Sequence, residues 1–175
     1  MSRAAIESNS GEVSRLLAGA AEMIAKTPYC WLATADAAGG AAFRPLGRLK
    51  SDPGDSGWTV RFVTDGRSRK ASDIRRNRRV TILFQEGDDA FVTLSGAAVL
   101  REGESEVQAR WRRAYEPYFP SEQDRANVAF VEVDADRMDL WIRGVTPEPF
   151  GMRTTTLVRD GAGAWRLISG DRGAA

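Results

Sequence analysis

The residues best suited to chemistry in this chain stand together at Ser68-Arg69-Lys70, shortly after an apolar run that ends at Val63-Thr64. Serine is a preferred helix N-cap, because its side-chain oxygen accepts a hydrogen bond from a free backbone N–H of the first turn. Two cations follow within that turn. A cap hydroxyl, free backbone N–H groups and two cations at a helix N-terminus together form a receptor for a phosphate dianion. The motif therefore predicts an anion site at residues 68–70.

The basic run from Arg67 to Arg79 also admits other interpretations. It carries seven cations and one acid, Asp73. Such a run can be a solvated helix face, or it can bind nucleic acid by neutralising phosphates. The formal net charge of the chain is only +1 and no aromatic residue interrupts the run, so we expect no nucleic-acid partner. The solvated face and the compact anion site both remain open at this point.

Composition excludes several other classes of protein. The 175 residues suit one domain, in which we expect residues 1–10 and 170–175 to be flexible. The chain has no histidine, which excludes histidine-ligated zinc and Ser-His-Asp hydrolysis, and we expect no metal. Cys30 is the single cysteine, so no intramolecular disulfide can form. Without an apolar run of membrane-spanning length or the apolar core of a signal peptide, we expect a cytoplasmic protein with no membrane association.

The hydrophobic pattern predicts a mainly β protein with flanking helices. Short turns between the strands are typical of an antiparallel meander, and Gly96 within a long strand predicts the kind of bend that a barrel needs. We expect an antiparallel barrel of six to eight strands with helices across its ends and side. The predicted helices are 12–25, capped by Ser10, then 69–77 and 104–118. The predicted strands are 29–36, 41–50, 58–64, 79–85, 90–101, a hairpin of 127–133 and 138–143, and a hairpin of 154–159 and 165–168.

Arg44-Pro45 and Trp141 are further candidates outside the basic run. A proline removes a donor from the strand ladder, so Pro45 marks an edge, a bulge or a strand end, where backbone groups are free to contact a ligand. Arg44 is then either a ligand contact or a cation satisfied across the sheet. Trp141 is either a core or interface side chain or a surface on which a ligand stacks. No pair of carboxylates is spaced for acid–base catalysis, so we name no catalytic residue.

Residues 64–80, TDGRSRKASDIRRNRRV, resemble the flavin-phosphate segment of the pyridoxamine 5′-phosphate oxidase superfamily. In that segment T-x-x-x-S-R-K opens a helix and R-V opens the next strand. The resemblance extends over about residues 25–143 and includes LATAD at 32–36, FVTLSG at 91–96 and DLW at 139–141. The segment RWRRAYEPYFP at 110–120 is similar to a Trp-Phe-Pro pattern of the general stress protein branch. The family fold implied is a split β-barrel, a homodimer that holds two FMN molecules in its interface.

The resemblance also implies a role for each matching residue. Ser68, Arg69 and Lys70 would bind the FMN phosphate. The isoalloxazine ring would lie along three consecutive residues of one strand, in a pocket that two residues of another strand also line. A tryptophan of the partner subunit would approach the ring. The residues in these further roles are Arg44, Pro45 and Leu46 along the ring, Val63 and Thr64 lining the same pocket, and Trp141 from the partner.

One departure from the family pattern bears on the activity. The oxidases carry an Arg-x-His substrate motif before the final hairpin, whereas this chain reads Phe150-Gly-Met152 there, followed by Arg153. Oxidation of a vitamin B6 phosphate is therefore not expected. The resemblance implies an FMN-dependent oxidoreductase that acts on another small molecule or on a reduced nicotinamide. The alternatives are a flavin-binding stress or sensor protein without turnover, and a reductase that uses a deazaflavin in place of FMN.

Overall fold

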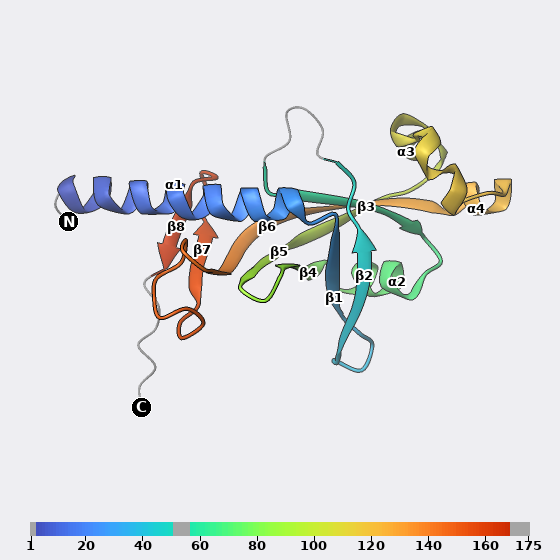
Figure 1. Ribbon diagram of the computed structural model, residues 1–175. Coiled ribbons are helices and arrows are strands. Elements are labelled where there is room, and N and C mark those ends of the chain that lie inside the picture. The colour runs from blue at the N-terminus through green and yellow to red at the C-terminus, as the bar shows by residue number, and fades with distance from the viewer. Residues whose placement is uncertain (1–2, 51–56, 169–175) are drawn as a thin grey trace.

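A computed structural model describes residues 3–50 and 57–168 of the chain (Figure 1). The segment 170–175 and nearly all of the expected loop at 51–57 lie outside these described residues. The helices are α1 (Arg3–Lys26), α2 (Arg69–Arg76), α3 (Glu104–Arg110), the 3-10 helix η1 (Arg113–Tyr118) and α4 (Glu122–Ala126). The strands are β1 (Tyr29–Ala35), β2 (Ala41–Gly47), β3 (Thr59–Asp65), β4 (Arg79–Glu86), β5 (Ala90–Arg101), β6 (Val128–Ile142), β7 (Thr155–Arg159) and β8 (Trp165–Ile168).

The eight strands form one antiparallel sheet in the order β2-β1-β4-β5-β6-β7-β8, and β3 pairs with β6. β5 pairs with one edge of β6 over nearly its whole length. The other edge of β6 pairs with β3 in its N-terminal half and with β7 in its C-terminal half. Within the described residues no pairing joins β2 to β8, so the barrel is split and not closed. The predicted fold, a mainly β split barrel with flanking helices, is confirmed.

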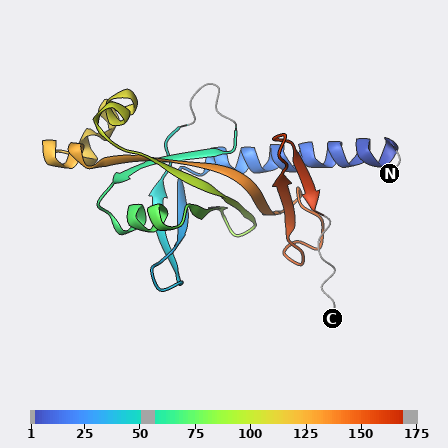
Figure 2. The ribbon, with the colours of Figure 1, turned by 180° about the vertical axis from the view of Figure 1, so that it is seen from behind.

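The core lies between the sheet and α1, which runs along one side of the molecule (Figure 1). Leu16, Ala20 and Met23 of α1 are buried at helical spacing against the inward side chains of β4, β5 and β6, which confirms a helix over the predicted range 12–25. Seen from behind, α3 and α4 lie at one end of the molecule, and the β7–β8 hairpin lies at the other (Figure 2). Among the described residues, no helix is both long and apolar enough to cross a membrane.

The N-terminal helix begins earlier than predicted. Ser10 is not its N-cap, because α1 begins at Arg3 and the Ser10 carbonyl accepts a hydrogen bond from the Ser14 hydroxyl inside the helix. The sequence before Ser10 contains alanine, isoleucine and glutamate, which extend a helix readily. The glycine at residue 11, which costs about 1 kcal/mol in a helix interior, does not end it.

The hairpin predicted around Asp134–Arg137 is wrong, because β6 is one strand of 15 residues. Its polar residues are satisfied within the sheet: Asp134 pairs with Arg159 of β7, and Arg137 pairs with Asp139. The ladder between β5 and β6 shifts register after Ser95, so the irregularity lies inside a strand pair and not at a chain reversal. This shift lies at Gly96, the position where the sequence predicts a bend.

Two other predicted elements end early. β2 stops at Gly47 and not at residue 50, because Arg48 turns toward the end of α1 and donates to the carbonyls of Ile24 and Thr27. The helix predicted over 104–118 is divided into α3 and η1. Pro117 lies in η1 and cannot supply the N–H that a continuous α-helix needs.

Candidate functional site

The N-terminus of α2 has the capped geometry that the sequence predicts. Ser68 is the N-cap, with φ −65° and ψ 152°, and its hydroxyl accepts a hydrogen bond of 3.4 Å from the Ala71 backbone N–H. The Thr64 hydroxyl at the end of β3 lies 3.4 Å from the Ser68 hydroxyl. Ala71 and Ile74 are completely buried, so the helix is fixed to the core, whereas Arg69 at its start is exposed. The predicted N-cap is confirmed.

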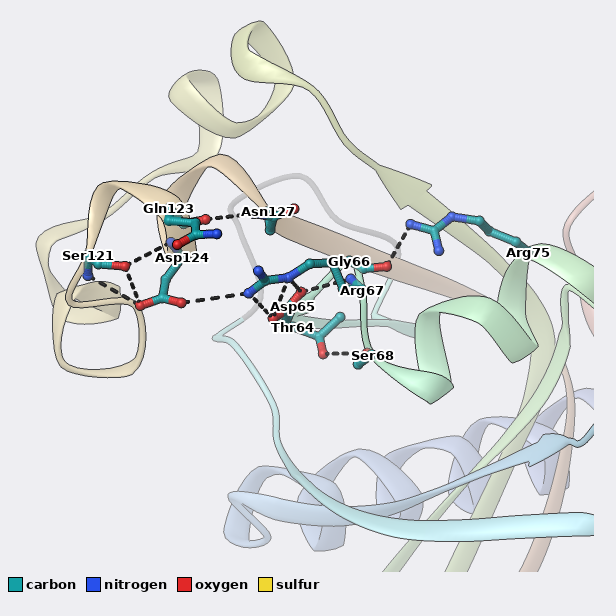
Figure 3. Close-up of polar contacts among 10 residues, drawn as sticks. All are labelled: Thr64, Asp65, Gly66, Arg67, Ser68, Arg75, Ser121, Gln123, Asp124 and Asn127. Atoms are coloured by element: carbon teal, nitrogen blue, oxygen red, sulfur yellow. Dashed lines mark hydrogen bonds and ion pairs between the residues drawn. The ribbon is translucent and has the colours of Figure 1, made fainter.

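The turn between β3 and α2 is held from two sides (Figure 3). The Gly66 N–H donates to the Asn127 carbonyl at 2.6 Å, and the Gly66 carbonyl accepts from the Arg75 guanidinium at 2.8 Å. Arg67 pairs with Asp65 at 2.7 Å and with Asp124 of α4 at 3.7 Å. A Cβ on Gly66 would lie 3.1 Å from the Asn127 carbonyl oxygen, which leaves little room for a side chain. The turn that presents Ser68 is therefore rigid.

Arg69 and Lys70 are the cations of the first turn. Arg69 is exposed and Lys70 is half-buried, and in the described part of the chain neither side chain has a hydrogen-bonding partner. Burial lowers the pKa of Lys70, and the nearby charge of Arg44 lowers it further, against a smaller opposite effect of Asp65. A buried cation beside another cation is stabilised by a bound anion. The arrangement therefore fits a phosphate group.

Arg44 reaches the same region from β2. Its guanidinium donates to the Thr34 hydroxyl at 3.2 Å and to the Asp73 carboxylate at 3.3 Å. Two nitrogens of Arg44 are thus hydrogen-bonded to neighbouring elements, as expected for a cation satisfied across the sheet. A guanidinium has five N–H donors, so these bonds do not exhaust its capacity.

The remaining arginines of the basic run are largely engaged by acids. Arg75 pairs with Glu102, Arg76 with Asp73, and Arg79 with Asp136. These pairs support the interpretation of this part of the run as a solvated, ion-paired face and separate it from the start of α2.

Neighbouring candidates on β2 and β3 point to opposite faces of their strands, since side chains alternate along a strand. Pro45 is exposed and Leu46 is buried in the core. Thr64 faces Ser68, whereas Val63 packs on the other side among aromatic residues. β2 ends the strand order, which confirms that Pro45 lies in an edge strand. These four residues of β2 and β3 therefore do not present their side chains to one surface. A ligand in contact with all of them would lie along the strand edges and would contact Leu46 and Val63 through their backbones.

Trp141 is far from the start of α2 within one chain. Thr64 pairs with Ala129 near the start of β6, whereas Trp141 lies near the end of that strand opposite Phe91. At about 3.3 Å per residue the stretch of β6 between these two positions is at most roughly 40 Å long. Trp141 is partly buried. The chain thus brings together Arg44, Thr64 and the Ser68–Lys70 turn, but not Trp141.

A cavity of about 860 Å³ lies between β3, β6 and the α3–η1 segment. Its aromatic lining comes from Trp111, Tyr115 and Phe130. Its charged lining consists of five cations and one acid, namely Arg48, Lys50, Arg61, Arg110, Arg112 and Glu132. This size suits a small-molecule site.

Glu132 organises the charges of this cavity. Its carboxylate accepts from Arg61 at 3.4 Å and from Arg101 at 3.2 Å, and Arg110 lies 3.7 Å away. Burial alone would raise the pKa of Glu132, but Arg101 and Arg61 outweigh burial and lower it. One carboxylate thus holds arginines from β3, β5 and α3 together.

Sequence reasoning missed Asp73, Gly66 and Glu132. Asp73 was visible as the only acid of the basic run, and its burial to 2% exposure shows that it is not part of a solvated face. Gly66 carried no signal beyond the turn that it occupies. Glu132 stands in a strand of ordinary alternation, and its three arginines come from different elements.

The comparisons with known proteins identify the family and the fold. The family model described as pyridoxamine 5′-phosphate oxidase matches residues 17–142. A search of curated proteins found no match.

Several solved structures share the fold. A protein related to general stress protein 26 from Clostridium acetobutylicum is 16% identical, with a TM-score of 0.65 over 83% of this chain and 94% of that one. A pyridoxamine 5′-phosphate oxidase-related, FMN binding protein from Nostoc punctiforme is 18% identical, with a TM-score of 0.64 over 96% of each chain. PhzG from Burkholderia lata, solved with tetrahydrophenazine-1-carboxylic acid, is 20% identical, with a TM-score of 0.62 over 89% of this chain and 88% of that one. With a family model matched over most of its length, this chain belongs to the pyridoxamine 5′-phosphate oxidase family.

Proposed function

We propose that this protein binds FMN, with the flavin phosphate at the start of α2. The observation that carries the proposal is the capped turn at Ser68, where the Arg69 and Lys70 side chains have no hydrogen-bonding partner in the described part of the chain. A phosphate there would accept bonds from backbone N–H groups and from both cations. Arg44 would face the polar edge of the ring. Family membership and the FMN binding relative of similar fold support the same ligand.

A homodimer with flavin at its interface completes the proposal. Tyr29, Trp31 and Phe43 are 72%, 47% and 63% exposed, and Trp31 pairs with Pro45 across β1 and β2. These side chains share the outer face of the hairpin, and an exposed apolar patch of this kind is typical of a protein interface. A second copy covering it would also supply Trp141 to the flavin of the first, which one chain cannot do for its own site.

The proposed activity is redox chemistry on a small molecule. The flavin supplies the electron transfer when it is bound, and the protein supplies binding, orientation and electrostatics. Because the chain has no histidine, a vitamin B6 phosphate is not the proposed substrate.

The absorbance spectrum of the purified protein tests the cofactor directly. An oxidised-flavin spectrum with one equivalent of FMN released on denaturation is the expected result. A deazaflavin has a different spectrum, and finding one would replace FMN in the proposal. Protein that is colourless and takes up neither compound on titration would refute flavin binding altogether.

An anaerobic reaction separates turnover from storage or sensing. If the protein is an oxidoreductase that accepts electrons from a reduced nicotinamide, NADH or NADPH should bleach the bound flavin, and air should restore it. Flavin that both nicotinamides leave oxidised would favour the alternative, a stress or sensor protein that binds flavin without turnover. The similarity in fold to a protein related to general stress protein 26 is the observation that favours this alternative.

A further inference from the structure

Asp73 connects the two parts of the candidate site. It lies in α2, one turn after the phosphate receptor, and is 2% exposed. One carboxylate oxygen accepts from the Thr34 hydroxyl of β1 at 3.0 Å and from the Arg44 guanidinium of β2 at 3.3 Å. Arg44 also donates to Thr34 at 3.2 Å. The three side chains form a closed triangle that joins one helix to two strands.

A buried carboxylate is costly unless it is paired and hydrogen-bonded. Burial raises the pKa of Asp73, but the hydrogen bonds from Thr34 and Arg44 outweigh it and the pKa is lowered overall. Asp73 is therefore an anion at neutral pH. Its other oxygen has a 3.5 Å contact with Arg76, whose side chain is 47% exposed. The strongest geometric constraint from Asp73 thus falls on Arg44, whose side chain is only 17% exposed.

The triangle fixes Arg44 relative to the start of α2. The guanidinium uses two of its nitrogens on Thr34 and Asp73, which sets the plane and direction of its remaining donors. It also lies close enough to Lys70 for the two charges to repel. Without a carboxylate behind it, Arg44 would be free to turn away from that second cation.

We propose that Asp73 is a positioning residue for the flavin site, holding the Arg44 guanidinium at a fixed place relative to the phosphate receptor on the same helix. This inference rests on the proposed function, because it concerns the binding of FMN. A single ligand can then meet both groups without ordering either of them, and this preorganisation increases affinity.

A pure charge effect and a positioning effect of Asp73 have opposite signs. Asp73→Asn removes a negative charge from a cationic site, so electrostatics alone predicts tighter binding of the FMN phosphate. If Asp73 acts by positioning Arg44, the same substitution weakens binding. The sign of the change therefore decides between the two.

The test is a titration of flavin-free protein with FMN, followed by flavin fluorescence, for wild type, Asp73→Asn, Arg44→Ala and the double variant. We expect Asp73→Asn to bind FMN about tenfold more weakly, within the range found for coupled neighbours. In the Arg44→Ala background, Asp73→Asn should cause no further loss. Asp136→Asn is the matched control, since it removes the same charge from an exposed carboxylate that pairs with Arg79, and it should bind FMN like wild type.

Thr34→Val provides a second route in case Asp73→Asn does not fold. It removes the shared hydroxyl of the triangle without changing the charge, and a loss of affinity of a few-fold is expected. Unchanged or tighter binding in Asp73→Asn, additive losses with Arg44→Ala, or unchanged binding in Thr34→Val would overturn the positioning role. Wild-type protein that binds no FMN would instead refute the proposed function itself.

Discussion

Gly96 of β5 lies directly against the main-chain carbonyl of Asp134 in β6, where a Cβ on residue 96 would be 2.0 Å from the oxygen. Both residues lie next to the register shift between β5 and β6, which form the longest strand pair of the sheet. Because the neighbour is backbone, no side chain can move aside. We expect Gly96→Ala to lower the free energy of unfolding by about 3 kcal/mol, at the upper end for an overpacked site.

Denaturant unfolding followed by circular dichroism measures this loss. Gly161→Ala is the matched control, because a Cβ there meets nothing within 4 Å, and its stability should be close to that of wild type. If the two variants were equally stable, β5 and β6 would be able to move apart at the register shift without loss of free energy of unfolding.

Removal of the two cations at the start of α2 should release the flavin. In Arg69→Ala/Lys70→Ala the phosphate loses two charge-assisted hydrogen bonds, each worth about 1.5–3 kcal/mol, so FMN should bind at least about a hundredfold more weakly. Riboflavin, which lacks the phosphate, should bind both proteins with similar affinity. Calorimetric titration with both flavins measures the difference.

Arg78→Ala/Arg79→Ala is the control for this loss of charge. It removes two cations just beyond the other end of α2, where Arg79 pairs with exposed Asp136, and should leave FMN affinity unchanged. If both double variants keep their full complement of flavin, the phosphate lies elsewhere.

A charge on the outer face of the β1–β2 hairpin should separate the proposed dimer. Trp31 is 47% exposed in one chain, so Trp31→Glu should cost the single chain little stability, whereas a buried unpaired carboxylate in an interface is costly. Light scattering after size exclusion should show a monomer. Tyr118→Glu, at a residue 75% exposed on η1, should remain dimeric, and a dimeric Trp31→Glu would place the interface on another face.

Cys30 should make stability fall at alkaline pH. Burial raises the pKa of its thiol from 9.0 to about 11, with a smaller opposite effect of Arg48. Between these values the unfolded chain loses the proton while the folded chain retains it, so the stability that Cys30 contributes is present below pH 9 and is lost by pH 11. The expected loss is roughly 2 to 3 kcal/mol relative to Cys30→Ala.

Unfolding curves of wild type and Cys30→Ala at pH 8, 9, 10 and 11, about the two pKa values, isolate this contribution. The difference in stability between the proteins should change by less than about 0.5 kcal/mol between pH 8 and 9 and should then shift more steeply against wild type up to pH 11. Parallel pH profiles would show that the folded thiol titrates as it does in the unfolded chain.

The local signals in the sequence were sufficient for most of the fold. The cap at Ser68 and the edge strand at Pro45 each depend on the chemistry of one residue and its neighbours, and both are confirmed. A register shift lies at Gly96, where the sequence predicts a bend. The resemblance in residues 64–80 supplied the family.

The errors occur where partners distant in sequence decide the structure. Asp134 and Arg137 have the composition of a turn, but Arg159 and Asp139 satisfy them within a continuous strand. No local pattern contains that information. Likewise, the role of Asp73 depends on Arg44, 29 residues away, and the gathering of arginines on Glu132 needs three separate elements.

β6 also governs how the molecule comes apart. It shares one edge between β3 and β7 and is paired along the other with β5. Along residues 130–134 it is paired on both edges, so amide protons there should exchange with solvent only when the sheet opens. The N-terminal strands and the C-terminal hairpin are therefore parts of one cooperative unit. A ligand seated beside β3 should slow amide exchange as far away as β7, with no change in structure between them.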